Sequence, residues 1–208
     1  QLLWLLALAC LGAFAMLSQS RGALLALVLT VIMAPLWFRD RHSRVFSMLA
    51  VVATGLALYA VYDLIAQRGS SYRPEIFHAV VDMIAAHPWT GLGLGAAYDV
   101  SAAGLHFDHT HNMFTHVAVE MGLPGMLLWA MVWLLTLGEI IRARGTLFGK
   151  ILLGFWVYST LAMQFDAASL TGTPRAEWFI SWLPVGLAMM LPWGRAENDA
   201  CGKISGST

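Results

Sequence analysis

Long apolar stretches separated by short polar segments make up most of this chain. A hydrocarbon core about 30 Å thick requires about 20 helical residues to cross it. Six stretches approach or reach that length: Gln1–Leu17, Gly22–Phe38, Val45–Ala66, Gly122–Ile141, Leu147–Phe165 and Trp178–Trp193. The pattern predicts an all-α fold, a polytopic transmembrane helix bundle with about six spans, as one membrane-embedded domain over residues 1–193.

Composition supports a membrane environment. Hydrophobic residues make up 59% of the 208 positions and charged residues 12%, and the mean hydropathy is +0.68, outside the range of soluble globular proteins. Several tryptophans stand at the ends of the apolar stretches, as in an interfacial aromatic belt: Trp4, Trp37, Trp178 and Trp193. The formal net charge is zero, so no nucleic-acid partner is expected.

The two ends of the chain differ in composition, and each predicts something about the protein. Gln1 lies inside an apolar run without a basic leader or cleavage site, so we interpret the chain as a fragment with further helices upstream. Residues 194–208 are polar and rich in Gly and Ser, which predicts a disordered cytoplasmic tail. Cys10 falls in a span and Cys201 in the tail, so no disulfide is expected.

The distribution of basic residues predicts the orientation. Eight of the twelve Lys and Arg residues fall in three inner segments: Arg39, Arg41, Arg44, Arg142, Arg144, Lys150, Arg195 and Lys203. The positive-inside rule assigns these segments to the cytoplasm. Residues 18–21, the long loop 67–111 and residues 166–177 then share the opposite, periplasmic or extracellular, face.

The outer loop contains a predicted surface helix. Pro74 suits a first helical turn, and the apolar positions form one stripe, so Pro74–Ala86 should be an amphipathic helix on the membrane surface. His87-Pro88 ends it. The glycines that follow, Gly91, Gly93 and Gly95, predict a flexible turn, for which plain loop flexibility is the favoured interpretation and backbone amides free to approach a ligand are the alternative. No strand precedes this GxGxG, so it does not indicate a dinucleotide fold.

Histidines cluster near the end of this loop, at positions 106, 109, 111 and 116. Zinc is the obvious ion to test, but a structural zinc site usually recruits Cys or a helical HxxxH pair, and neither is present. We therefore predict no metal. His116 and Glu120 are four residues apart, which indicates an interfacial helix pair.

His111 has a distinct setting. At about 100° per residue, a helix would place positions 111, 115, 118, 122 and 125 on one face, which reads His, Thr, Ala, Gly, Gly. Such a face admits a close neighbouring helix, and Pro124 should bend the helix. At a helix N-terminus the dipole keeps an imidazole neutral, so His111 could act as a general base. A capping or headgroup-anchoring histidine is the alternative.

Two arginines share the predicted outer face with His111. Arg21 lies in a very short outer turn and Arg73 opens the surface helix. Arginine suits bidentate contact with phosphate, and a charge at the membrane interface is costly unless it is used. Headgroup snorkelling is the alternative for each, and we accept it for Arg68. Arg175 is on the same side.

Three motifs together resemble the bacterial O-antigen ligase and polymerase superfamily. They are the Ser-Arg-Gly at 20–22, the Arg73 helix ending in His87-Pro88-Trp89-Thr90-Gly91-Leu92-Gly93-Leu94-Gly95, and the His-Asn-x9-Gly-x-x-Gly at 111–125. The resemblance covers about residues 18–182 and does not separate the members. Asp166, followed by Pro174-Arg175-Ala176-Glu177-Trp178 and then Trp182-Leu183-Pro184, is similar to the closing segment of some ligases and favours a ligase.

The resemblance implies glycosyl transfer in lipopolysaccharide biosynthesis, at the periplasmic face of the bacterial inner membrane. The donor would be a glycan on undecaprenyl diphosphate and the acceptor the lipid A core, without metal, nucleotide or other cofactor. His111 corresponds to the essential histidine, and Arg21 and Arg73 to diphosphate-binding arginines. Arg175 is a further candidate substrate contact, and Asn112, Gly122 and Gly125 are structural motif positions.

Four other functions stay open. An O-antigen polymerase would use the same donor with a glycan acceptor, and a protein O-oligosaccharyltransferase would use a Ser or Thr side chain. A membrane transporter should place ionisable groups near the bilayer midplane, whereas these spans are nearly free of charge. A catalytically silent lipid-binding or assembly subunit is the remaining alternative.

Overall fold

The computed structural model describes residues 20–68, 72–165, 170 and 177–191 of the chain, and these residues are mostly helical. In chain order the elements are α2 (Arg21–Met33), α3 (Pro35–Phe38), α4 (Arg41–Arg68), α5 (Arg73–Ala86), β1 (Val100–Ala102), β2 (Leu105–Phe107), α6 (Met113–Arg142), α7 (Leu147–Ala162) and α8 (Glu177–Met189). The predominance of helix predicted from the sequence is therefore confirmed, and the two short strands are an addition that the sequence did not predict.

Helices occupy five of the six apolar stretches, and Gln1–Leu17 lies outside the described residues, as does the predicted tail at 194–208. Within the part of the chain that the structure describes, two helices are long and apolar enough to cross a bilayer, judged by length and composition: Arg41–Ala60 and Met113–Arg142. The number of six spans and their orientation stay predictions.

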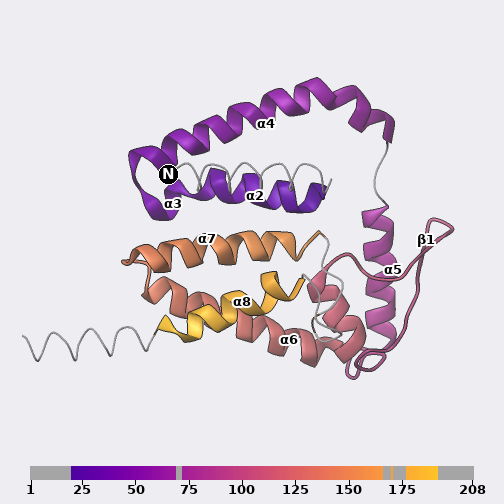
Figure 1. Ribbon diagram of the computed structural model, residues 1–208. Coiled ribbons are helices and arrows are strands. Elements are labelled where there is room, and N and C mark those ends of the chain that lie inside the picture. The colour runs from indigo at the N-terminus through magenta and orange to yellow at the C-terminus, as the bar shows by residue number, and fades with distance from the viewer. Residues whose placement is uncertain (1–19, 69–71, 166–169, 171–176, 192–208) are drawn as a thin grey trace, which may run out of the picture.

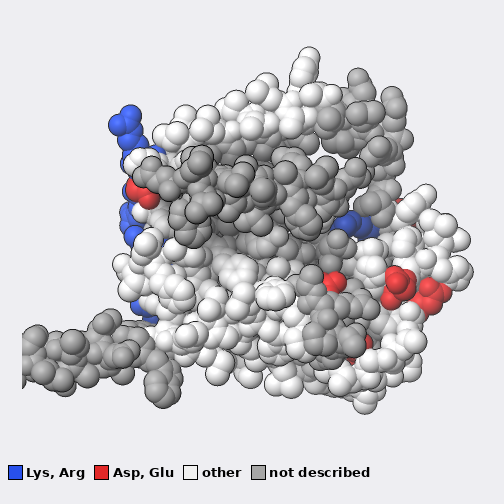
Figure 2. All heavy atoms as spheres, viewed as in Figure 1, with Lys and Arg blue, Asp and Glu red and all other residues white. Residues whose placement is uncertain are grey.

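The long helices run roughly along one direction, and α5 lies across one end of them beside the β-hairpin (Figure 1). Helix α2 contacts α4 and α7, the helices α6, α7 and α8 contact one another, and α5 contacts α6 and β1. The other end carries α3 and the turn between α6 and α7. Figure 2 shows most of the visible Lys and Arg at that second end, with an acidic group among them, and most of the visible Asp and Glu near α5 and the hairpin, with a basic group on that side.

Tryptophans form the centre of the bundle. The rings of Trp129 and Trp133 lie 5.7 Å apart, and Trp133 stacks on Trp156 at 5.5 Å. The indole N–H of Trp133 donates to Thr160 Oγ1 at 2.9 Å, so this buried donor is satisfied. These tryptophans join helices to one another, a role distinct from the interfacial belt expected of those at the span ends.

Helix α5 confirms the helix predicted at 74–86, and its location on the membrane surface stays a prediction. Ile76 and Val80 are buried on it and pack against Val100, Ala102 and Val119, while Phe77 and Val81 stay exposed. The hairpin that covers α5 was not predicted. Its strands have three residues each, which is too short for alternation to be recognised, and they are joined by Ala103 and Gly104, both at positive φ as a type I′ turn requires.

Helix α6 is broken at Gly122, which has φ +69° and ψ −175°. The bend that Pro124 predicts is thus confirmed, and it lies two residues earlier because glycine adopts the left-handed backbone without strain. At the break the carbonyl groups of Val119 and Glu120 lose their usual helical donors. The N–H of Leu123, which would donate to Val119, points away from the helix, and Pro124, which would donate to Glu120, has no N–H.

The loop after α5 supplies the missing partners. The amides of Leu92 and Gly93 donate to the carbonyls of Val119 and Glu120 at 2.8 and 2.9 Å, and Leu123 N–H donates to Pro88 O at 2.8 Å. Gly95 N–H donates to the Glu120 carboxylate at 3.2 Å. The alternative that the glycine-turn amides are free for a ligand is therefore wrong, because Gly91 N–H donates to His87 O and α6 accepts from Gly93 and Gly95.

The predicted small face that begins at His111 is also wrong in two respects. His111 lies before α6, whose N-cap is Asn112, so it has no helical phase. Gly122 packs against the backbone carbonyl of Trp89 rather than a neighbouring helix, and Gly125 makes room for Met121 across the break. The spacing of Gly122 and Gly125 therefore reflects the break in α6 and the loop that docks on it.

We predict that Gly122→Ala destabilises the protein by ~2 kcal/mol, because a Cβ there would lie 2.7 Å from the Trp89 carbonyl carbon and φ is positive. The melting temperature in detergent, followed by tryptophan fluorescence, should fall by about 4–8 °C. Gly138→Ala is the matched control, because it lies in the same helix with nothing within 4 Å of its added Cβ. Equal melting temperatures for the two variants would contradict the docking of the loop.

Candidate active site

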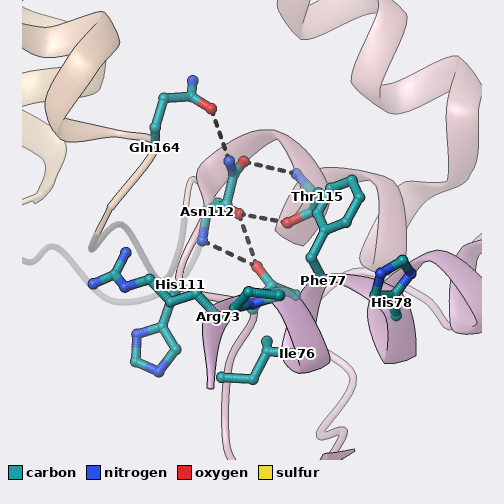
Figure 3. A pocket seen from close by; sticks show the side chains of 10 residues that line it. Arg73, Ile76, Phe77, His78, His111, Asn112, Thr115 and Gln164 are labelled. Atoms are coloured by element: carbon teal, nitrogen blue, oxygen red, sulfur yellow. Dashed lines mark hydrogen bonds between the residues drawn. The ribbon is translucent and has the colours of Figure 1, made fainter. Parts of the chain in front are cut away.

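A cavity of about 430 Å³ opens at the end of the bundle where α5 crosses. Its lining comes from four places: the first turn of α5, the residues just before α6, the first turn of α6, and the end of α7. The polar lining residues are Arg73, His78, Thr110, His111, Asn112, Thr115 and Gln164. The volume falls within the range of small-ligand pockets, about 300–1,000 Å³. Arg73 and His111, far apart in sequence, thus face one cavity (Figure 3).

His111 has a left-handed backbone, with φ +56°. A non-glycine residue there is uncommon, though histidine is among the tolerated types. The residues on both sides hold it: the buried Thr110 hydroxyl donates to Asn112 O at 2.8 Å and accepts from Asn112 N–H at 3.4 Å. This short clamp turns His111 out of the path of α6 and into the cavity wall.

Asn112 fastens the same segment to two helices. Its side-chain oxygen caps α6 by accepting from Phe114 N–H at 2.9 Å and Thr115 N–H at 3.2 Å. Its side-chain amide donates to Gln164 Oε1 at 2.8 Å, and Met113 N–H donates to Met163 O at 3.0 Å. The segment that carries His111 is therefore tied to the end of α7 (Figure 3).

Phe165 connects Arg73 with the start of α2. The guanidinium carbon of Arg73 lies 5.6 Å from the centre of the Phe165 ring, a cation–π contact. A Cβ on Gly22 would lie 2.5 Å from Phe165 Cβ, so glycine is required for this approach. Arg21, the first residue of α2, is next to Gly22 in the chain, and α2 begins at the α5 end of the bundle (Figure 1).

Other aromatic groups surround the His111 ring. The ring centre of His109 lies 3.9 Å from that of His111, and Phe107 meets His111 edge-on at 6.2 Å. His109 Nδ1 is 2.5 Å from Asp108 Oδ1, and this hydrogen bond holds the pKa of the Asp108 carboxyl below its ordinary value. The imidazole of His111 is therefore packed between β2 and the turn that precedes α6.

His116 belongs to a separate buried group. Burial raises the pKa of Tyr98 to about 12, so its hydroxyl stays protonated, and it forms a hydrogen bond with His116 Nδ1 at 2.6 Å. His116 Nε2 lies 3.5 Å from Glu120 Oε1, and both side chains are buried. The predicted His116–Glu120 helix pair is confirmed, beneath the loop and outside the cavity lining. In the part of the chain that the structure describes, no three His, Cys, Asp or Glu side chains are grouped to hold a metal ion.

Of the residues proposed from sequence, Arg73, His111 and Asn112 meet at the cavity. Only the backbone of Arg21 is described, and Arg175 lies outside the described residues. Sequence reasoning missed Gln164 and Phe165. A glutamine closing an otherwise apolar stretch was a signal for the first, but its partner Asn112 is 52 residues away.

Comparison with known proteins gives two findings. Residues 6–130 match a family model described as O-Antigen ligase. A curated O-antigen ligase from Pseudomonas aeruginosa strain PAO1 is 29% identical over 194 residues, which cover 90% of this chain and 47% of that protein. The chain thus spans about half the length of this relative. Arg21, Arg73 and His111 all fall within the residues that match the family model.

We predict that Asn112→Ala lowers the free energy of unfolding by about 1–2 kcal/mol, because it removes the N-cap of α6. Asn112→Asp should stay close to the wild type, because the carboxylate still caps and the Gln164 amide can rotate to donate to it. Thermal unfolding of the purified variants measures both. Thr146→Ala, which removes the corresponding cap of α7, is the reference for an ordinary cap loss. An Asp variant as unstable as the Ala variant would contradict this assignment.

Proposed function

The chain belongs to the O-antigen ligase family, and on that premise we propose that it is a membrane glycosyltransferase that ligates a lipid-linked glycan to the lipid A core. The donor in this proposal is undecaprenyl diphosphate carrying the glycan. One observation carries the proposal: an arginine suited to a diphosphate, Arg73, and a histidine suited to proton transfer, His111, line the same cavity.

His111 is the general base in this mechanism. It takes the proton from a hydroxyl of the acceptor sugar, whose oxygen attacks the anomeric carbon of the donor. The bond from that carbon to the diphosphate breaks, and the undecaprenyl diphosphate leaves as an anion. General-base assistance contributes about 10²–10⁴-fold, so positioning and electrostatic stabilisation supply the remainder. The clamp around His111 supports this role, because a base must be held in one orientation.

Arg73 stabilises the negative charge that develops on the leaving diphosphate, and Arg21 assists it. The contact with Phe165 supports the role of Arg73, because it fixes the side chain while leaving the guanidinium edge available for phosphate oxygens. The approach of Gly22 to Phe165 supports the inclusion of Arg21. Arg175 is a further substrate contact in this proposal. No cofactor is invoked.

The proposed setting is the inner membrane, with about six spans in residues 1–193 and the cavity facing the periplasm. The gathering of basic residues at the opposite end of the bundle supports this orientation (Figure 2). The exposed Phe77 and Val81 support a surface location for α5, because they can enter the lipid while Ile76 and Val80 pack inward. A membrane-bound donor could then enter the cavity from the side.

The acceptor separates the proposed ligase from its relatives. Deletion of the full-length gene should remove all O-antigen from lipopolysaccharide while lipid-linked chains accumulate. A single capped repeat would instead indicate a polymerase, and unchanged lipopolysaccharide with unglycosylated exported proteins would indicate a protein O-oligosaccharyltransferase. A transporter or a silent assembly subunit would not depend on a proton-accepting side chain at 111.

We predict that His111→Ala, returned to the deletion strain in the full-length protein, reduces glycan transfer by about 10²–10⁴-fold, because the general base is lost. The measurement is the O-antigen ladder on a gel, at matched protein levels. His106→Ala is the matched control, because this exposed histidine of β2 pairs with Asp99 and does not line the cavity. Normal laddering in His111→Ala would reject the base assignment.

We predict that Arg73→Lys reduces transfer by about 10–100-fold, because lysine keeps the charge but loses the bidentate contact with phosphate. Arg142→Lys, at the other end of α6 and paired with Glu139, makes the same exchange and should leave the ladder unchanged. Wild-type activity of Arg73→Lys would assign the residue to headgroup snorkelling. The measurement is again the O-antigen ladder on a gel, at matched protein levels.

A further inference from the structure

A second cavity, of about 570 Å³, lies at the opposite end of the bundle from the first. Three segments line it: α3 and its C-cap, the turn between α6 and α7, and the start of α7. Helix α7 separates the two cavities by about 24 Å, the length of 16 helical residues. This cavity therefore cannot belong to the site that holds Arg73 and His111.

Three cations converge on this second cavity. Arg39 comes from the C-cap of α3, Arg144 from the turn, and Lys150 from the first turn of α7. No carboxylate among the described residues lines the cavity. Among the described residues the ion pair nearest in the chain joins Arg142 to Glu139, and it involves none of the three.

Orientation of the chain alone does not explain this arrangement. The positive-inside rule is satisfied by a basic residue anywhere at this end, and Arg41 and Arg44 satisfy it while lying away from the cavity. Lys150 also stands near the N-terminus of α7, where the helix dipole disfavours a cation and no acidic residue compensates. An anion in the cavity would offset both the repulsion among the three cations and the unfavourable interaction of Lys150 with the helix dipole.

The rest of the lining is apolar. Leu36, Phe38, Ile141 and Leu153 form the wall, and Leu36 is largely exposed. Trp37 fixes the position of α3, because its indole packs against α7 at Gly154, where an added Cβ would lie 3.6 Å from the ring. A ligand that fits this lining combines a phosphate with hydrocarbon chains.

We propose that this cavity binds the phosphate headgroup of an anionic phospholipid, with Arg39, Arg144 and Lys150 contacting the phosphate and the apolar wall contacting the acyl chains. The bound lipid joins α3 to the α6–α7 turn. This site does not depend on the glycosyl transfer proposed above.

The test is native mass spectrometry of the full-length protein released from detergent in the presence of phosphatidylglycerol or phosphatidylcholine. We expect the wild type to retain phosphatidylglycerol in preference to phosphatidylcholine. The variant R39Q/R144Q/K150Q should lose this retention by about 100-fold. The matched control, R41Q/R44Q/R142Q, removes the same charge from the same end and should retain the lipid.

Several results would overturn the proposal. Equal loss in both triple variants would indicate diffuse electrostatic attraction, and equal retention would show that the three cations do not bind lipid. Displacement of the lipid by inorganic phosphate at equal concentration would assign the cavity to a soluble anion. If the triple variant does not fold, Arg144→Gln alone, in an exposed turn, should weaken retention by about fivefold, and unchanged retention would reject the site.

Discussion

The hydrogen bonds between residues 88–93 and the break in α6 are the constraint on which the candidate site depends. An interrupted helix in an apolar environment must find partners for its released carbonyls, since no water is there to accept or donate. Leu92 and Gly93 meet this need, and Leu123 is satisfied by Pro88 in return. Because α5 leads directly into this loop, the exchange fixes α5 across the end of the bundle. Arg73, at the start of α5, is thereby brought to the cavity that His111 lines.

Elements that depend on local periodicity could be predicted from the sequence. The long apolar helices, the amphipathic α5 and the bend near Pro124 follow from spacing and from proline. The placement of His111 could not be predicted in this way, because its position on a helical face was calculated as if α6 began before residue 111. The side chain of Asn112 decides that boundary by capping α6, and a cap competes with propagation of the helix in a way that periodicity does not register.

Contacts between segments distant in the sequence were harder still to predict. The glycines at 91, 93 and 95 indicated a turn, but only the partner exposed at Gly122 determines what their amides bind. The pairing of Asn112 with Gln164 and the approach of Gly22 to Phe165 join segments more than 50 residues apart. Predicting Arg73 and His111 as neighbours required the membrane face that the basic loops imply, together with the family resemblance.

The strained backbone of His111 links this packing to chemistry. A left-handed histidine costs about 1–3 kcal/mol and persists only where its surroundings hold it. Thr110 and Asn112 hold it from both sides, and Asn112 is itself held by the start of α6 and the end of α7. A shift of either helix would therefore move the imidazole relative to Arg73. Phe165, the residue after Gln164, contacts Arg73, so the turn that follows α7 contacts both Arg73 and the Asn112 that holds His111.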